Sequence, residues 1–270
     1  QHLPMPPDPS AVPVAPTVVL PPFSAICLPP FVLLALLRPP PHHSSTYPVG
    51  TNLALVGFTI LALQFVVSAR LKWIERPFGL NVLFQFHKAM AIVASLLLLS
   101  HPILLALGCG DWSLIFGPQV IWHIWLGRIA LLLVLVHALL ASFRLVIKLN
   151  YETWRFVHNL GAVLILPLGF FHSWKAGGDL QLVGMKVFWA GLLIAAGVSY
   201  LWHRVLRTIL LLRQPYKVTS VLEAAAGVWT IALTPPDGVA TFDYPPGHFP
   251  CLPFPLPPTL PWEHNTSAPS

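Results

Sequence analysis

Histidine is the side chain best suited to chemistry in this sequence, which holds 12 histidines and three cysteines. Two apolar stretches each carry a histidine pair at the same interval: His87 and His101 lie 14 residues apart, and so do His158 and His172. On an α-helix 14 residues is just under four turns, so the members of a pair share a face within about 40° and lie roughly 21 Å apart along the axis. The cysteines are far apart and lack CxxC spacing, so they indicate neither a disulfide framework nor a thiolate metal site.

Facing imidazoles on neighbouring helices are the arrangement that holds a b-type haem inside a helix bundle. If the two helices run in the same direction, His87 is level with His158, and His101 is level with His172. We therefore predict two stacked haems whose irons have histidine at both axial positions, which suits electron transfer because no iron site is open. Zinc fits less well, because its four ligands would have to converge whereas the two levels are about 21 Å apart. A hydrogen-bonded packing role is the alternative for any single histidine, and the repeated interval favours haem ligation over it.

The elements that must position these histidines are membrane helices. The chain has 270 residues, of which 56% are hydrophobic and only 9% charged, whereas soluble domains carry about 25% charged residues. Six apolar stretches are long enough to cross a bilayer, although prolines interrupt the first. They lie at 17–37, 52–69, 82–107, 119–143, 156–174 and 185–206. We predict a multi-pass integral membrane protein with its chemistry mostly inside the lipid bilayer.

The basic residues predict the orientation of the chain. Eleven of the 15 lysines and arginines follow the second, fourth and sixth stretches or begin the third. Because such residues are retained on the cytoplasmic side, both termini are expected to be cytoplasmic, in a plasma membrane or a bacterial inner membrane. The third and fifth stretches then run in the same direction, from inside to outside. These loops account for the net charge of +6, so no nucleic acid partner is expected.

Other polar and aromatic residues in the spans have simpler interpretations. His137 lacks an equally spaced companion and is expected to pack in the core or beside the site. Arg128 lies a few residues inside the fourth span, where its charge would pair with an anion such as a haem propionate or reach water by snorkelling. Trp154 is expected either to pack against the inner haem or to lie at the membrane interface. Four further tryptophans predict an aromatic belt on the outer side: Trp122, Trp125, Trp174 and Trp189.

Sequence motifs around the histidines resemble a known family. ERPFGLNVLFQFHK before the third span, LGRIALLLV in the fourth and YETWRFVHNL in the fifth, together with the two histidine pairs, resemble the ferric reductase-like transmembrane domain of ferric reductases and NADPH oxidases. The resemblance covers about residues 50–260. It implies that NAD(P)H reduces FAD on the cytosolic side and that FAD passes single electrons to an inner haem and then an outer haem.

The same resemblance implies a role for each histidine of the pairs. His87 and His158 would hold the inner haem, and His101 and His172 the outer one. The acceptor on the far side would be ferric iron or O2. Arg128 and His123, near the outer level, are candidates for attracting an anionic acceptor such as an Fe(III) chelate.

The segment after the last span resembles the start of the family's FAD-binding β-barrel. YKVTSVLEAAAGVWTIALTPPDG is β-rich, and the family's Pro-Gly-Gln-Phe element is represented by Pro246-Gly247-His248-Phe249. His264 corresponds to the first residue of the next flavin-contacting element, whose Pro-Phe pair is missing here. There is also no Gly-rich nicotinamide-binding motif. FAD binding through His248 and His264 is thus expected only from an incomplete domain, and a disordered Pro-rich extension is the alternative.

These observations predict an all-α transmembrane fold followed by a small β segment. We expect a Pro-rich tail at 1–16, a six-helix bundle with two stacked b haems at 17–210, and a partial FAD-binding barrel or disordered tail at 215–270. The expected function is oxidoreductase activity, with electrons from a cytosolic NAD(P)H and flavin donor crossing the membrane. Two alternatives remain: a haem-only subunit fed by a separate cytosolic flavin reductase, and a non-redox transporter or scaffold.

Overall fold

The fold is described from a computed structural model. It covers residues 46–69, 71, 74–75, 78–213, 216–236 and 238. The chain divides into two compact units, with the division between His203 and Arg204. The predicted first span at 17–37 lies outside the described residues, and so do His248 and His264.

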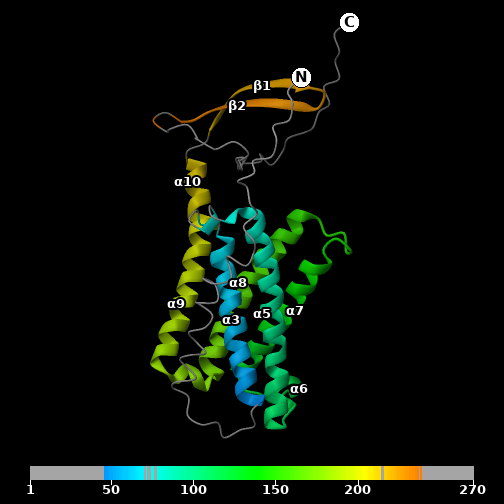
Figure 1. Ribbon diagram of the computed structural model, residues 1–270, viewed down its shortest axis with the longest axis vertical. Coiled ribbons are helices and arrows are strands. Elements are labelled where there is room, and N and C mark those ends of the chain that lie inside the picture. The colour runs from blue at the N-terminus through cyan, green and yellow to red at the C-terminus, as the bar shows by residue number, and fades with distance from the viewer. Residues whose placement is uncertain are drawn as a thin grey trace. The chain divides into compact units, whose positions relative to one another are not determined.

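The first unit is helical, as Figure 1 shows. In chain order its elements are α3 (Thr46–Ser68), α5 (Leu80–Cys109), α6 (Ser113–Phe116), α7 (Trp122–Phe143), α8 (Tyr151–Ala176), the 3-10 helix η2 (Gly178–Gln181) and α9 (Val183–Tyr200). The last helix continues as a π-helix, η3 (Leu201–Leu206), and as α10 (Arg207–Arg213). Five helices in the described part of the chain are long and apolar enough to cross a membrane. They confirm five of the six predicted spans, and the chain is an integral membrane protein.

Local sequence explains where the two histidine-bearing helices begin and end. The side chain of Asn150 accepts a hydrogen bond from the Thr153 backbone N–H (2.8 Å) and so caps the start of α8. Helix α5 ends at Gly110, which adopts the left-handed conformation (φ 68°) and donates its N–H to the Ala106 carbonyl. Each helix is continuous through an internal proline, Pro102 in α5 and Pro167 in α8. Each predicted histidine pair therefore lies on one unbroken helix.

Helix α3 packs closely along α5 because glycines remove the side chains between them. A Cβ atom on Gly57 would lie 3.0 Å from Leu98 Cγ, 3.1 Å from Leu97 Cβ and 3.2 Å from the Ala94 carbonyl oxygen. Gly50, two turns earlier, would place a Cβ 2.7 Å from Leu105 Cδ1. The backbones of α3 and α5 are thus as close as two helices without intervening side chains allow.

The core of the bundle lies between α3, α8 and α9. Trp189 of α9 is fully buried, stacks on Phe58 of α3 (ring centroids 5.2 Å apart) and donates its Nε1–H to Ser173 Oγ of α8 (2.8 Å). The predicted aromatic belt is therefore wrong for Trp189, because its indole N–H is paired inside the protein and has no need of the interface. Trp122 and Trp125 are exposed, as a belt requires.

Close backbone contacts join α3 to α5, α7 to α8, and α3 to α9. Helices α5 and α8, which carry the histidine pairs, are not among the helix pairs that share extensive backbone contact. They approach each other through side chains, and ring contact between His87 and His158 bridges them. The backbones of α5 and α8 are therefore far enough apart for histidine side chains to fill the space between them.

The second unit contains a β-hairpin that confirms the predicted β character of this segment. Strand β1 (Lys217–Ala225) pairs antiparallel with β2 (Val228–Thr234), and Gly227 in the turn has φ 77°. The side chains of both strands are exposed almost throughout, on both faces. A two-stranded hairpin exposed on both faces is marginally stable by itself, so it is suited to be part of a larger sheet.

The glycine contact between α3 and α5 gives a first prediction. Replacing Gly57 with Leu should lower the free energy of unfolding by about 1–3 kcal/mol, because the new side chain meets atoms already at contact distance. The measurement is a denaturant titration in mixed micelles. Gly191→Leu is the matched control, since a Cβ there has nothing within 4 Å. Equal stability of the two variants would show that α3 and α5 do not pack at this distance.

Candidate functional site

The two histidines nearest α6 are held by backbone carbonyls of neighbouring helices. His101 Nδ1–H of α5 donates to the Gly50 carbonyl of α3 (3.0 Å), and His172 Nδ1–H of α8 donates to the His123 carbonyl of α7 (2.8 Å). A carbonyl oxygen only accepts hydrogen bonds, so Nδ1 carries the hydrogen in each ring. In the neutral imidazole the lone pair is then on Nε2, which is free to coordinate a metal.

Glycines make room for this arrangement. A Cβ on Gly127 of α7 would lie 2.5 Å from His172 Nδ1 and 2.6 Å from its Cε1, so only glycine admits the ring at this position. Gly50 both supplies the carbonyl for His101 and allows α3 to approach α5. Each of the two rings, one from α5 and one from α8, is therefore held where a neighbouring helix comes close, and their meeting at one level of a site stays a prediction.

The second level lies at the end of the bundle where α7 and α8 are connected. The ring centroids of His87 and His158 are 6.2 Å apart, with an angle of 67° between the ring planes. His87 Nδ1 is buried and has no hydrogen-bond partner among the described residues. The predicted pair of His87 and His158 is thus brought together across α5 and α8.

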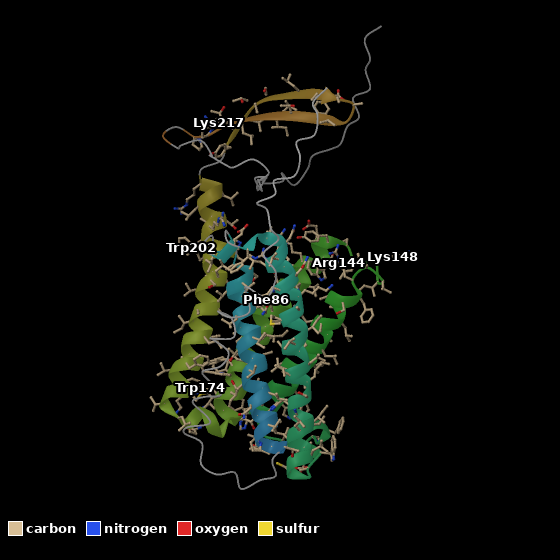
Figure 2. All side chains as sticks on the ribbon, viewed as in Figure 1. Phe86, Arg144, Lys148, Trp174, Trp202 and Lys217 are labelled. Carbon is tan, nitrogen blue, oxygen red and sulfur yellow. The ribbon has the colours of Figure 1, made fainter. Side chains whose placement is uncertain are left out.

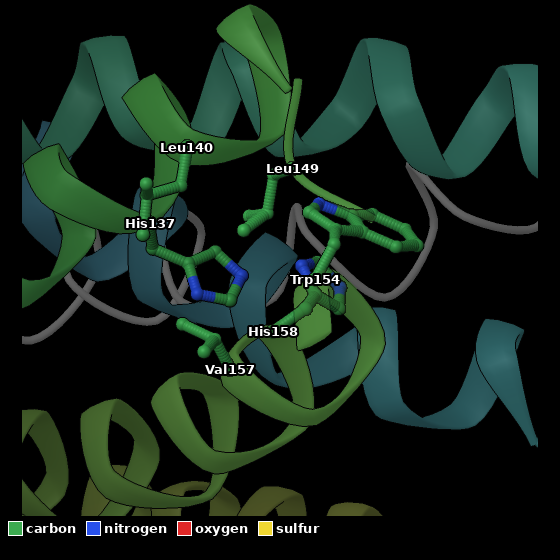
Figure 3. Close-up of a pocket in the computed structure, with 6 residues that line it drawn as sticks. All are labelled: His137, Leu140, Leu149, Trp154, Val157 and His158. Atoms are coloured by element: carbon green, nitrogen blue, oxygen red, sulfur yellow. The ribbon is translucent and has the colours of Figure 1, made fainter. Parts of the chain in front are cut away.

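His158 is packed between two further rings. His137 of α7 lies against it (centroids 4.3 Å apart, 30° between planes), and Trp154 stacks on it (5.1 Å, 27°). Gly161 leaves space for the His137 ring, since a Cβ there would be 2.7 Å from His137 Nδ1. Figure 3 shows these rings around a small pocket, which Leu140, Leu149 and Val157 also line. The prediction that His137 packs beside the site agrees with this contact.

A sequence comparison identifies the region that contains these levels. The family described as "Ferric reductase like transmembrane component" has a sequence profile that matches residues 53–169. This segment is thus similar to the ferric reductase-like transmembrane component. It contains His87, His101 and His158, and α8 carries the remaining histidine, His172, three residues beyond it. No curated protein matches the chain.

Arg128 in the ferric reductase-like domain is bonded to the loop that carries α6. Its Nε–H donates to the Leu114 carbonyl (3.1 Å), and its terminal nitrogens donate to the carbonyls of Gly117 (2.6 Å), Ser113 (2.6 Å) and Leu114 (3.0 Å). The guanidinium also lies 4.8 Å from the centroid of the Trp125 ring. The expected contacts of Arg128 and His123 with an anionic acceptor, or of Arg128 with a haem propionate, stay predictions.

The start of the same loop is held by a carboxylate. Asp111 Oδ1 accepts the backbone N–H of Ser113 (2.8 Å), and hydrogen bonds from the side chain and backbone of Ser113 lower the pKa of the exposed Asp111 carboxyl. The ionised form therefore persists to lower pH than in a free aspartate. Asp111 and Arg128 together fix the loop beside the His101 and His172 level.

Sequence reasoning missed the residues that hold the histidines in place. Gly50, Gly127 and Gly161 lie in apolar helices, where a glycine is unfavourable unless another group needs the space. The sequence shows these glycines, but the histidine that packs against each one is 24 to 51 residues away in the chain. Only the packing of the helices identifies it.

The contact between Gly127 and His172 can be tested in the haem-free chain. Gly127→Val should displace the His172 ring and break its bond to the His123 carbonyl, because a Cβ would overlap the ring. The 15N chemical shifts of labelled histidine should then show loss of the tautomer with hydrogen on Nδ1 at this residue. Gly197→Val, where a Cβ meets nothing within 4 Å, should leave the spectrum unchanged. An unchanged His172 signal in Gly127→Val would contradict the geometry.

Arg128 gives a prediction about the loop. Arg128→Gln removes most of four hydrogen bonds to loop carbonyls. Hydrogen exchange of backbone amides in 113–117 should accelerate roughly 10- to 100-fold, as the loss of about 1.5–3 kcal/mol implies. Lys175→Gln, an exposed cation at the C-terminal end of α8, is the control. Unchanged exchange would mean that the loop is held by other contacts.

Proposed function

We propose that this chain carries single electrons across a membrane through two b-type haems and reduces an acceptor on the far side. The family match and the apolar helices support membrane-spanning oxidoreductase function in general. The finer assignment rests on one observation: His101 of α5 and His172 of α8 each have Nδ1 hydrogen-bonded to a backbone carbonyl, which leaves the lone pair of the neutral ring on Nε2. When bound, the haems would take up and pass on one electron at a time.

The separation of the rings supports a metal between His87 and His158. Two imidazoles that each bind one metal through a bond of about 2.0–2.1 Å have ring centroids roughly 6 Å apart. The measured centroid distance is 6.2 Å.

Each residue of the two levels has a proposed role in holding a group of fixed orientation. His101 and His172 would bind the outer haem, and the carbonyls of Gly50 and His123 keep their Nε2 lone pairs directed away from the hydrogen-bonded side. His87 and His158 would bind the inner haem. With histidine on both sides of each iron, electrons would reach the acceptor without its binding to iron. Suitable acceptors are a chelated Fe(III) or O2.

The electron donor is proposed to be a flavin bound on the predicted cytoplasmic side. The β1–β2 hairpin supports this, because both of its faces are exposed and suit a barrel that continues beyond it. His248 and His264, the predicted flavin contacts, remain part of this proposal. NAD(P)H would act as the source of electrons for that flavin.

Haem content tests the proposed function. The full chain, purified from haem-replete cells, should contain about two haems per chain with the spectrum of low-spin b-type haem. His101→Leu and His87→Leu should each remove one, because one of two axial ligands is lost. His203→Leu is the control, since His203 lies in η3 and is not one of the four proposed ligands. A colourless wild-type preparation would contradict the proposal.

A further inference from the structure

Arg144 lies at the end of α7 and is held over two aromatic rings. Its guanidinium carbon is 5.1 Å from the centroid of the Trp154 ring and 5.4 Å from that of Tyr151. Arg144 follows the last residue of α7, so it is at the same end of the bundle as His158; Figure 2 labels Arg144 and Lys148 there. Cation–π contacts to two rings restrict where its hydrogen-bond donors lie.

Two donors in this cluster are buried without an acceptor. Arg144 Nε and Trp154 Nε1 are both inaccessible to solvent and have no hydrogen-bond partner among the described residues. Each can only donate, so they cannot satisfy each other. Unpaired buried donors are costly, and one of these belongs to a permanent cation. An acceptor that carries negative charge would satisfy both donors and balance the charge of the guanidinium.

Trp154 connects these donors to the proposed inner level. Its ring stacks on His158 with centroids 5.1 Å apart, and the Arg144 guanidinium lies at the same distance from it. A ligand bound through His158 would thus have its edge close to the two donors. The matching group on a b-type haem is a propionate carboxylate, whose two oxygens suit the planar guanidinium.

On the basis of the proposed function, we propose that Arg144 and Trp154 bind a propionate carboxylate of the haem held by His87 and His158. Arg144 Nε–H and Trp154 Nε1–H would each donate to a carboxylate oxygen. Arg128, at the other level, differs because its donors are already bonded to the carbonyls of the α6 loop. The two arginines therefore have different partners, and the anion-binding one is Arg144.

Haem with and without free carboxylates tests this assignment. The haem-free full chain in detergent is loaded with iron protoporphyrin IX or with its dimethyl ester, and haem loss to excess apomyoglobin is timed. Wild type should release the ester faster than the acid at one of the two levels. At that level, Arg144→Leu should release iron protoporphyrin IX roughly 10- to 100-fold faster than wild type does. It should release the dimethyl ester at the wild-type rate.

Trp154→Phe provides a milder variant that keeps an aromatic ring beside His158 but removes Nε1–H together with the five-membered ring of the indole. It should weaken the preference for the acid by a smaller factor than Arg144→Leu does. Arg155→Leu is the control, because Arg155 is an exposed cation next to Trp154, and it should behave as wild type. A redox titration adds a second readout: without Arg144 one haem should have a lower midpoint potential, because the carboxylate charge near it is no longer balanced.

The outcomes separate this inference from the proposed function. A wild type that binds no haem contradicts the proposed function. The inference is wrong if the wild type holds two haems and the preference for the acid survives in both Arg144→Leu and Trp154→Phe. If that preference survives while binding of phosphatidylglycerol falls, the partner of Arg144 is a lipid phosphate, and the inference is wrong.

Discussion

An imidazole presents a defined lone pair only when its other nitrogen is held, and the ferric reductase-like domain depends on this constraint. At the His101 and His172 level the holding groups are backbone carbonyls of adjacent helices. A helix carbonyl is reached from a neighbouring helix only where the two backbones are close, which is why Gly50 and Gly127 adjoin these bonds. Helix packing and orientation of the site histidines are therefore set by the same residues.

The two levels satisfy this constraint by different means. His101 and His172 are fixed by directional hydrogen bonds, which also raise the basicity of the ring. His158 is instead packed between His137 and Trp154, and stacking restrains the plane of a ring without selecting its tautomer. The level at the α6 end is thus the more strictly specified of the two. Substitutions near the other level are expected to act through ring packing and charge.

The sequence predicted the features that depend on local periodicity. The five described spans and the continuity of each histidine pair follow from apolar stretches and from an interval of 14 residues. It could not predict the carbonyl partners of His101 and His172, which lie 51 and 49 residues away. Nor did the position of Trp189 near a span end reveal its burial, because Ser173, which pairs with its N–H, comes from another helix. Contacts of this kind depend on how helices pack, which the hydropathy pattern does not encode.

The two arginines show why charge alone does not identify an anion site in a membrane. Arg128 satisfies its donors with neutral carbonyls of the α6 loop, so it needs no anion as a direct partner, yet it keeps its full positive charge. Arg128 follows Gly127, which packs against His172, and attraction of an anionic acceptor by the field of this charge stays a prediction. Arg144 is the opposite case, because its buried Nε has no hydrogen-bond partner among the described residues. The number of its hydrogen-bond donors that are already paired therefore indicates whether an arginine attracts an anion at a distance or binds it directly.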